Sequence, residues 1–265
     1  RQVYGKCGVC CCPVPLDSQG MDLTALSASG ATAAHLSPSH HYPTGLVTPI
    51  GRRQALLQWV RDRNAVIIED DYDSEFRFSG LPIPTLQSID AGGRVIYMNT
   101  FSKSLVPSLR ISYMILPPKL LERYEATQSF YSCTVSSFEQ HTLAQFIAQG
   151  YFERHLNKMK NYYQKQRTLL LKALHNSPLS KISTITERNA GTHFLLHVRT
   201  KLTEEEIRAK AQAANLSLSF YSDYSYRKDY DQQGTLVINY AAITEENIAA
   251  IIDKLASLFP ECDQK

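Results

Sequence analysis

The chain has 265 residues, of which 43% are hydrophobic and 20% are charged, and its formal net charge is +3 at pH 7. This composition is typical of an ordinary globular protein and excludes an intrinsically disordered chain. The charge is too small to indicate nucleic-acid binding by itself. No apolar run reaches the roughly 18 residues that a membrane span needs, and no secretory signal opens the chain. We therefore expect a cytoplasmic protein without a membrane segment.

The segment between Cys7 and Cys12 carries four cysteines in the pattern C-x-x-C-C-C. One interpretation is a zinc site, but a structural zinc site needs a second pair of ligands at a defined spacing, and the nearest histidines do not supply it. The other interpretation is a buried strand over residues 9–14 that uses cysteine as a small hydrophobic residue. We favour the strand. We therefore predict no metal site and, in a reducing compartment, no disulfide.

The first half of the chain alternates between short apolar runs and a helical pattern. Proline and glycine predict a loop over residues 37–45, and the spacing of leucine, tryptophan and valine predicts a helix over residues 49–63. Strands are predicted at 32–36, 65–71, 94–98 and 111–116. Strands this apolar are usually buried on both faces. The pattern therefore favours an α/β fold with a mixed, mostly parallel sheet covered by helices.

The second half of the chain is richer in helical patterns. Helices are predicted at 134–149, 151–175, 203–215 and 244–259, and strands at 192–198 and 235–240. Thr203 and Glu206 have the spacing of a capping box. The helix from residue 151 is basic and rich in tyrosine; a nucleic-acid face is one interpretation, and a solvated helix that links two domains is the favoured one. We expect a large domain over residues 1–150, then this helix and a small α+β domain over residues 151–265.

Polar residues follow two of the predicted strands. Asp70 ends one strand, and Thr100, Ser102 and Lys103 follow the next. Ligands of doubly wound sheets bind beyond the carboxyl ends of the strands, so these side chains are candidates for one ligand site. Pyridoxal 5′-phosphate suits the set, because its aldehyde needs a lysine amine and its ring nitrogen needs a carboxylate. Its phosphate needs hydroxyl donors and a guanidinium, for which Arg110 is the candidate.

Spacing alone leaves other interpretations open. An acid at a strand end often caps a turn, and a lysine in a loop is usually solvated. Residues 100–103 loosely resemble the S-x-x-K pattern of hydrolases with a lysine base, but serine does not stand first, and the companion S-D-N and K-T-G motifs are absent. A P-loop is ruled out because the chain contains no G-x-x-x-x-G-K-[ST] sequence.

Four stretches resemble the aminotransferase-like domain of MocR/GabR-type bacterial transcription regulators of the GntR family. They are "PSHHYPTG", "EDDYDSEFRF", "NTFSKSLVPSLRISYMILP" and "TVSSFEQHTLAQFIAQGYFERHLNKM". The resemblance runs over nearly the whole chain, and it implies fold type I of the pyridoxal-phosphate enzymes, used as an effector-sensing domain. It also implies a homodimer, and DNA binding through an N-terminal winged-helix domain that this chain does not show.

The resemblance implies a role for each candidate residue. Lys103 resembles the lysine that forms an aldimine with the cofactor, and Asp70 resembles the partner of the ring nitrogen. Tyr72 resembles the tyrosine that contacts the phenolic oxygen of the cofactor. Tyr42 stands where aminotransferases carry an asparagine beside that same oxygen. The implied phosphate contacts are Thr100, Ser102 and Arg110.

Three departures from the family pattern bear on the function. The chain is expected to begin inside the large domain, after a phosphate-binding loop and an aromatic residue that stacks on the cofactor. Tyr42 replaces the asparagine, and Val237 stands where aminotransferases carry an arginine that binds the substrate carboxylate. Such an arginine contributes charge-assisted hydrogen bonds of ~1.5–3 kcal/mol each. Its loss predicts weak or no transaminase turnover, unless Arg199 or Arg227 substitutes for it.

These observations favour a domain that senses an effector over an enzyme. The expected ligand is an amine, an amino-acid-like molecule or the cofactor vitamer itself, recognised through the lysine aldimine. The alternative is a pyridoxal-phosphate-dependent aminotransferase that acts on an amino acid. Both interpretations use Lys103, and they differ in whether proton transfer at the α-carbon of the ligand is completed. A third interpretation, an interaction module that has lost the cofactor, is opposed by the intact set of candidate residues.

Overall fold

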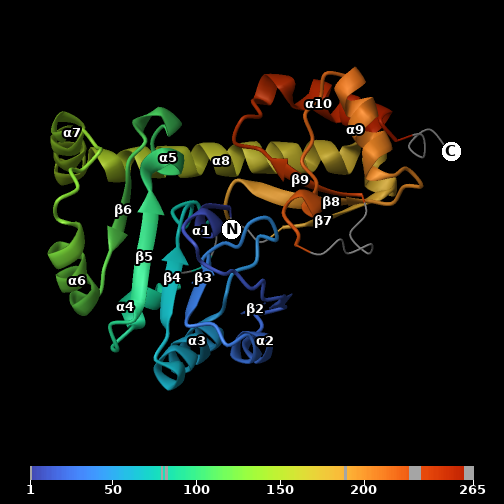
Figure 1. Ribbon diagram of the computed structural model, residues 1–265. Helices are drawn as coiled ribbons and strands as arrows, with labels where there is room; N and C mark the ends of the chain where they lie inside the picture. Colours follow the sequence, from blue (N-terminus) through green and yellow to red (C-terminus); the bar gives the residue numbers. More distant parts are fainter. Residues whose placement is uncertain (1, 79, 81–82, 188–189, 227–233, 260–265) are drawn as a thin grey trace. The chain divides into compact units, whose positions relative to one another are not determined.

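The structure is a computed structural model, and it describes residues 2–78, 80, 83–187, 190–226 and 234–259. The chain divides into two compact units, and Figure 1 colours it from blue to red along the sequence. Unit 1 consists of Arg1–His41, Leu46–Ser74 and Leu81–Gln149, and unit 2 consists of Tyr42–Gly45, Glu75–Gly80 and Gly150–Lys265. Each unit has its own sheet and its own apolar core.

Unit 1 contains a four-stranded sheet with the order β3-β4-β5-β6. Its strands are β3 (Ala33–Leu36), β4 (Val66–Asp70), β5 (Val95–Thr100) and β6 (Ser112–Ile115). β3, β4 and β5 run parallel, and β6 is antiparallel to β5. The register pairs His35 with Ile68 and Asp70 with Met98, so the parallel strands end at one edge of the sheet. The predicted α/β fold with a mixed, mostly parallel sheet is confirmed.

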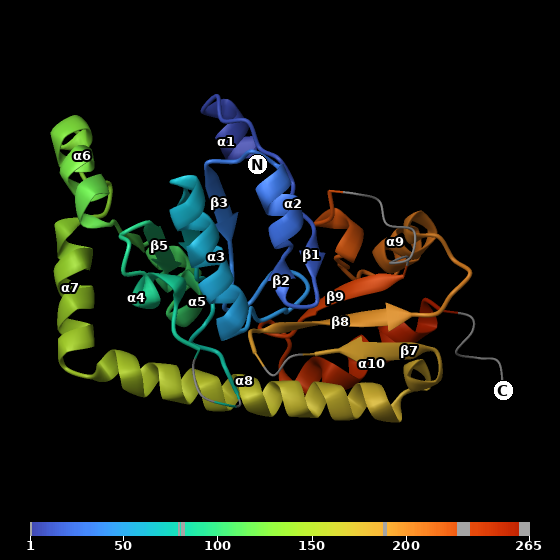
Figure 2. The same ribbon diagram turned by 90° about the horizontal axis from the view of Figure 1, so that it is seen from below.

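Helices α2 (Leu23–Ala28) and α3 (Ile50–Arg63) pack against each other in unit 1 (Figures 1 and 2). The predicted helix over residues 49–63 is confirmed by α3, which ends where Asn64 adopts a left-handed conformation with φ 50°. Its leucines, tryptophan and valine are buried and share one apolar core with residues of the strands. The apolar core of unit 1 consists of Leu26, Ala34, Leu36, Leu56, Leu57, Trp59, Val60, Ala65, Ile67, Leu86 and Val95.

Strands β3 and β6 depart from the expectation of burial on both faces. Alternate residues of β3 are exposed, and all four residues of β6 are exposed. β6 stands at the end of the strand order, and in the part of the chain that the structure describes it pairs with β5 alone. The helices that follow, α6 (Pro118–Gln128) and α7 (Ser137–Ala148), contain no buried residue. The prediction is wrong for one face of β3 and for both faces of β6, because an apolar run shows what a strand is able to bury, but not whether a neighbour covers it.

The predicted buried strand over residues 9–14 is also wrong, because these residues form no strand and Val9 is 50% exposed. Pro13 and Pro15 lack the N–H that a sheet ladder needs, which accounts for the irregular backbone. The exposed cysteines of this region are Cys7, Cys10 and Cys12. The neighbouring elements are α1 (Gln2–Lys6) and a short antiparallel pair, β1 (Leu16–Asp17) and β2 (Gly20–Met21).

Unit 2 contains a three-stranded antiparallel sheet with the order β7-β8-β9. Its elements are β7 (Ser183–Thr186), β8 (His193–Val198) and β9 (Thr235–Asn239), with the helices α8 (Tyr151–Asn176), α9 (Glu204–Ala213) and α10 (Ile248–Ser257). α8 and α10 pack against each other and share one apolar core with the strands (Figure 2). Leu170 and Leu174 of α8 belong to this core, as do Ile252 and Leu255 of α10.

The elements predicted for this half of the chain are confirmed, with shifts at their ends. The hydroxyl of Thr203 accepts the N–H of Glu206 at 3.2 Å, and the carboxylate of Glu206 accepts the N–H of Thr203 at 2.8 Å, which confirms the capping box. The last helix begins at Ile248, because residues 245–247 first form a 3-10 turn. Within the described parts of the chain, no helix combines the length and the hydropathy that a membrane span requires.

Candidate functional site

Lys103 lies just beyond the end of β5 in unit 1. β5 passes directly into the four-residue helix α5 (Phe101–Ser104), and the hydroxyl of Thr100 caps this helix by accepting the N–H of Ser102 at 3.2 Å. Lys103 lies on α5 and is exposed. β4 runs parallel to β5 and ends with Asp70 at the same edge of the sheet. The topology therefore brings the predicted acid and the predicted lysine to one edge.

The connection between β5 and β6 reverses direction at the 3-10 turn η1 (Pro107–Leu109). Arg110 follows this turn in the left-handed region, with φ 50°, and is exposed. The hydroxyl of Thr100 lies 3.3 Å from the carbonyl oxygen of Ile111 and 3.0 Å from the hydroxyl of Ser102. The reversal therefore returns the chain beside Arg110 to the end of β5, where the two predicted hydroxyls lie together.

The carboxylate of Asp70 has a partner that the sequence analysis did not identify. His35, near the end of the neighbouring strand β3, has its Nε2 3.4 Å from Oδ2 of Asp70. Nδ1 of the same ring lies 3.0 Å from the hydroxyl of Tyr4 in α1. Burial and then the charge of Asp70 raise the pKa of Tyr4. The side chain of Asp70 is 38% exposed, so it remains accessible to a ligand while His35 contacts it.

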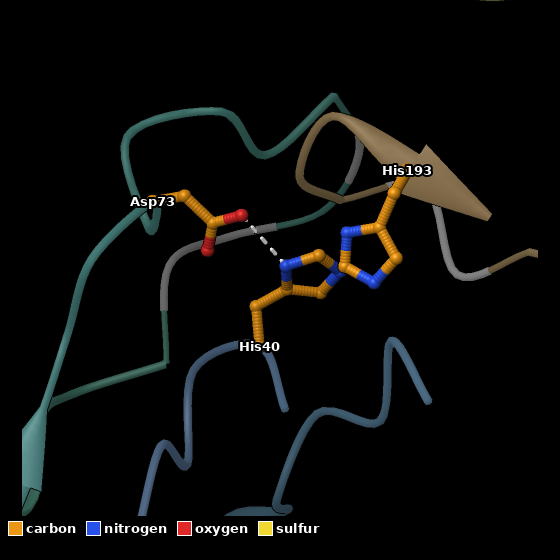
Figure 3. A group of neighbouring side chains, drawn as sticks. All are labelled: His40, Asp73 and His193. Carbon is orange, nitrogen blue, oxygen red and sulfur yellow. Dashed lines mark hydrogen bonds and ion pairs between the residues drawn. The ribbon is translucent and has the colours of Figure 1, made fainter. Parts of the chain in front are cut away.

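Tyr72 is held by a buried pair that consists of His40 and Asp73. Its hydroxyl donates to the main-chain oxygen of His40 at 3.0 Å. Nδ1 of His40 donates to Oδ2 of Asp73 at 2.8 Å, and the two side chains are 1% and 2% exposed (Figure 3). Burial raises the pKa of Asp73, against the opposing effects of the hydrogen bond from His40 and the charge of Lys103. The candidate lysine therefore acts electrostatically on the carboxylate that holds His40.

Asp71, which precedes Tyr72 in the sequence, is also held by hydrogen bonds. Its Oδ2 accepts hydrogen bonds from the hydroxyls of Tyr97 and Ser74, each at 2.8 Å. The Tyr97 hydroxyl in turn accepts a hydrogen bond from Nδ2 of Asn99 at 3.0 Å. Burial and the charge of Asp71 raise the pKa of Tyr97. These contacts fasten the segment after β4 to the end of β5.

Arg53 and Glu69 form a second buried pair in unit 1. Their charged atoms lie 3.7 Å apart, and the side chains are 1% and 0% exposed. Glu69 accepts the main-chain N–H groups at the start of α4 (Leu86–Ile89), and burial raises its pKa despite these bonds and Arg53. Arg53 donates to the main-chain oxygens of Pro38, Thr48 and Pro84. The sequence signal for this pair is an arginine on the apolar side of a predicted helix.

Tyr42 belongs to unit 2, unlike the other candidate residues, which all lie in unit 1. Its ring centroid lies 4.7 Å from that of His193 and 4.8 Å from that of Tyr224, both of which are also in unit 2. Burial and the hydrogen bond with Tyr224 raise the pKa of Tyr42. Its role beside the phenolic oxygen of a cofactor stays a prediction from the sequence.

The position expected to carry a carboxylate-binding arginine is occupied by a buried valine. Val237 lies in β9 and is 5% exposed. Of the two arginines considered as substitutes, Arg199 is exposed and donates to the carbonyl oxygen of Lys181 at 2.7 Å. Arg227 lies outside the described residues.

The chemistry at this edge of unit 1 fits pyridoxal phosphate. Lys103 and Arg110 are exposed, and the residues Thr100 and Ser102 are partly exposed. The edge offers an amine for an aldehyde, the carboxylate of Asp70 for a ring nitrogen, and hydroxyl and guanidinium donors for a phosphate.

Residues 6–255 match the family model for aminotransferase class I and II. The chain belongs to this family. It is 40% identical, over 92% of its length, to the uncharacterized HTH-type transcriptional regulator YhdI of Bacillus subtilis (strain 168). It is 34% identical, over 93% of its length, to the probable rhizopine catabolism regulatory protein MocR of Rhizobium meliloti. These matches cover 51% and 50% of the two regulators, so the chain spans about half the length of these curated relatives.

A solved aminotransferase shares the fold. LysN, an α-aminoadipate aminotransferase from Thermus thermophilus, matches with a TM-score of 0.81 and 26% identity, over 94% of this chain and 65% of that structure. LysN was solved in complex with N-(5′-phosphopyridoxyl)-L-leucine. The family and its solved members imply pyridoxal phosphate as the cofactor and show fold type I. The resemblance to MocR-type regulators is confirmed.

Proposed function

We propose that this chain is a pyridoxal-phosphate-binding, effector-sensing domain of a bacterial transcription regulator, with Lys103 as the residue that links to the cofactor. The observation that carries the proposal is the convergence of Lys103, Asp70 and two hydroxyls at one sheet edge. The matches to full-length regulators at 40% and 34% identity support the regulatory role over an enzymatic one.

Different side chains of unit 1 bind different parts of the cofactor. Asp70 holds the ring nitrogen in its protonated form, with His35 beside the carboxylate. Arg110, Thr100 and Ser102 bind the phosphate, for which a guanidinium supplies two parallel hydrogen bonds. When bound, the cofactor supplies an aldehyde that reacts with amines. This reactivity would give the domain its selectivity for an amine, an amino-acid-like ligand or the vitamer itself.

Sensing is favoured over transamination because Val237 offers no charge to a substrate carboxylate. Weak binding of the carboxylate would leave an amino acid poorly oriented for proton transfer at its α-carbon. The second candidate function, an aminotransferase that acts on an amino acid, is supported by the match to LysN.

The rest of the regulator follows from its relatives. The HTH-type designation of YhdI suggests that DNA is bound through a winged-helix domain outside the present sequence. We propose that the complete regulator is a cytoplasmic homodimer, in which the chain described above senses the effector.

The proposal is tested by titrating the protein with pyridoxal phosphate and recording the visible absorbance. The unsubstituted chain should develop an absorbance band, and Lys103→Ala should lose it. Lys119→Ala is the matched control, because Lys119 is an exposed lysine on α6 of the same unit. Its band should equal that of the unsubstituted chain. Absence of the band in the unsubstituted chain, or its persistence in Lys103→Ala, would contradict the proposal.

Sensing and turnover are then separated by adding candidate amines to the loaded protein. A sensor should show a spectral change that saturates with ligand, without steady release of a keto acid. Steady formation of a keto acid at ordinary enzymatic rates would favour the aminotransferase.

A further inference from the structure

The buried pair of His40 and Asp73 is not used by the function proposed above. Both side chains are almost completely buried, and they are joined by a 2.8 Å hydrogen bond (Figure 3). Removing a carboxylate from water costs free energy that a buried partner often only offsets, and well-packed apolar residues of similar volume are frequently as stable. Net stability is therefore a weak explanation for this pair. A better explanation is that the pair holds a neighbouring part of the chain in place.

The pair holds Tyr72 from two directions. Asp73 is the next residue in the chain, so fixing its carboxylate fixes the main chain on one side of the tyrosine. His40 supplies the main-chain oxygen that accepts the Tyr72 hydroxyl at 3.0 Å, and the centroids of their two rings lie 6.3 Å apart. Asp71, bound to Tyr97, fixes the main chain on the other side. Both the base and the tip of the Tyr72 side chain are therefore set by buried polar contacts.

We propose that Asp73 and His40 are positioning residues, which set the place of the Tyr72 hydroxyl and thereby the proton affinity of the lysine–cofactor linkage. This inference rests on the proposed function and on the role that the family resemblance implies for Tyr72, which is contact with the phenolic oxygen of the cofactor. Neither residue needs to touch the cofactor. The hydrogen bond from His40 to Asp73 fixes the loop that carries the main-chain oxygen, and Tyr72 follows that loop.

The direction of the effect follows from charge. The Tyr72 hydroxyl carries one proton, so when the cofactor binds, its donation turns from the main-chain oxygen of His40 to the phenolic oxygen, while the main chain still sets the place of the ring. This hydrogen bond stabilises the negative charge of the phenolic oxygen and weakens its attraction for a proton on the nearby linkage nitrogen. Displacing Tyr72 removes this donor, so the linkage should hold its proton to higher pH. One hydrogen bond to a charged oxygen corresponds to about one pH unit in the midpoint of the spectral titration.

The test is a spectral pH titration of the cofactor-loaded protein. In Asp73→Leu, which has no acceptor for His40, the midpoint of the visible band should rise by about one pH unit. In Asp73→Asn, which keeps an acceptor oxygen, the midpoint should stay near that of the unsubstituted protein. Asp62→Leu, at an exposed acid on α3, is the matched control and should leave the midpoint unchanged.

A double-mutant cycle distinguishes positioning from a general structural effect. Tyr72→Phe alone should raise the midpoint as Asp73→Leu does. Adding Asp73→Leu to Tyr72→Phe should then cause no further rise, because the contact through which Asp73 acts is already gone. Equal rises from Asp73→Leu in both backgrounds would overturn the proposal.

A second pair of variants covers the case in which Asp73→Leu fails to fold. His40→Ala removes the donor to Asp73 and should raise the midpoint, whereas His40→Asn keeps a donor at a similar distance and should restore it. An unchanged midpoint in His40→Ala would overturn this proposal alone if the unsubstituted protein binds the cofactor. If the unsubstituted protein shows no band, the proposed function and this inference both fail.

Discussion

The two units bury different kinds of side chain. Every arginine, aspartate and glutamate that is buried among the described residues lies in unit 1, and these residues are Arg53, Glu69, Asp71 and Asp73. Counted over the residues that the structure describes, the apolar core of unit 2 contains 18 buried residues, whereas that of unit 1 contains 11. The unit that carries the candidate site therefore has the smaller apolar core and also bears the desolvation cost of the buried charges.

This difference teaches how a binding site is supported in this chain. Side chains that must meet a ligand in fixed positions need partners that do not move, and short polar side chains linked by hydrogen bonds provide them in unit 1. Unit 2 is stabilised mainly by apolar packing. Because this packing is less directional than hydrogen bonding, it tolerates small shifts of the side chains.

The largest effect is expected from Arg53→Met. It leaves Glu69 buried without its cation and removes the donor to three main-chain oxygens, so the free energy of unfolding of unit 1 should fall by ~3–5 kcal/mol. Hydrogen exchange measured by mass spectrometry should show faster exchange in peptides of unit 1. Arg61→Met on the same helix is the control, because Arg61 is exposed; a loss as small as that of the control would contradict the prediction.

The corresponding change in unit 2 is Leu196→Ala in β8. Leu196 is 0% exposed, and removing its buried methyl groups should lower the free energy of unfolding by ~2–5 kcal/mol. Faster hydrogen exchange should appear in peptides of unit 2, with the midpoint of the cofactor titration unchanged. Ile185→Ala is the control, because Ile185 is the cross-strand partner of Leu196 but is 39% exposed. The contrast between units fails if Leu196→Ala changes exchange in unit 1 as much as in unit 2.

A smaller effect concerns the pH dependence of unit 1. Burial, with a contribution from the charge of His40, lowers the pKa of His41 from 6.5 to about 4. Between these values the unfolded chain binds a proton that the folded chain does not, so the free energy of unfolding should decrease as the pH falls through this window. His41→Gln removes this term, and relative to the unsubstituted protein it should gain stability below pH ~6.5.

Urea unfolding at a series of pH values measures this difference. His175→Gln, at an exposed histidine in the last turn of α8, is the control and should run parallel to the unsubstituted protein. A difference between His41→Gln and the unsubstituted protein that stays constant from pH 7 to ~4.5 would contradict the expected shift.

Much of the fold was predictable from the sequence because its signals are local. The apolar side of α3 and the capping box at Thr203 depend on residues a few positions apart. The ends of the parallel strands, and with them the common edge of Asp70 and Lys103, followed from the expectation of a parallel sheet. Family resemblance then supplied the roles that spacing left open.

The supporting contacts of the site were not predictable because they join distant segments. His35 meets Asp70 through the register of two strands, and His40 meets Asp73 through the path of a loop. Neither register nor loop path is encoded in a short window of residues. The exposure of β6 was missed for a related reason, since an apolar run does not reveal what lies beside it.

The exposed strand β6 has a consequence for the behaviour of this chain at high concentration. Tyr113, Met114 and Ile115 are 40%, 48% and 42% exposed, and in the described part of the chain one side of the strand has no neighbouring strand. A strand edge without a neighbouring strand, flanked by apolar side chains, forms a template on which another extended segment is able to pair. Association by this route requires two molecules, so its rate should rise with the square of the concentration. Dilution, or a lysine in place of Met114, would therefore protect the protein during storage better than a more stable core.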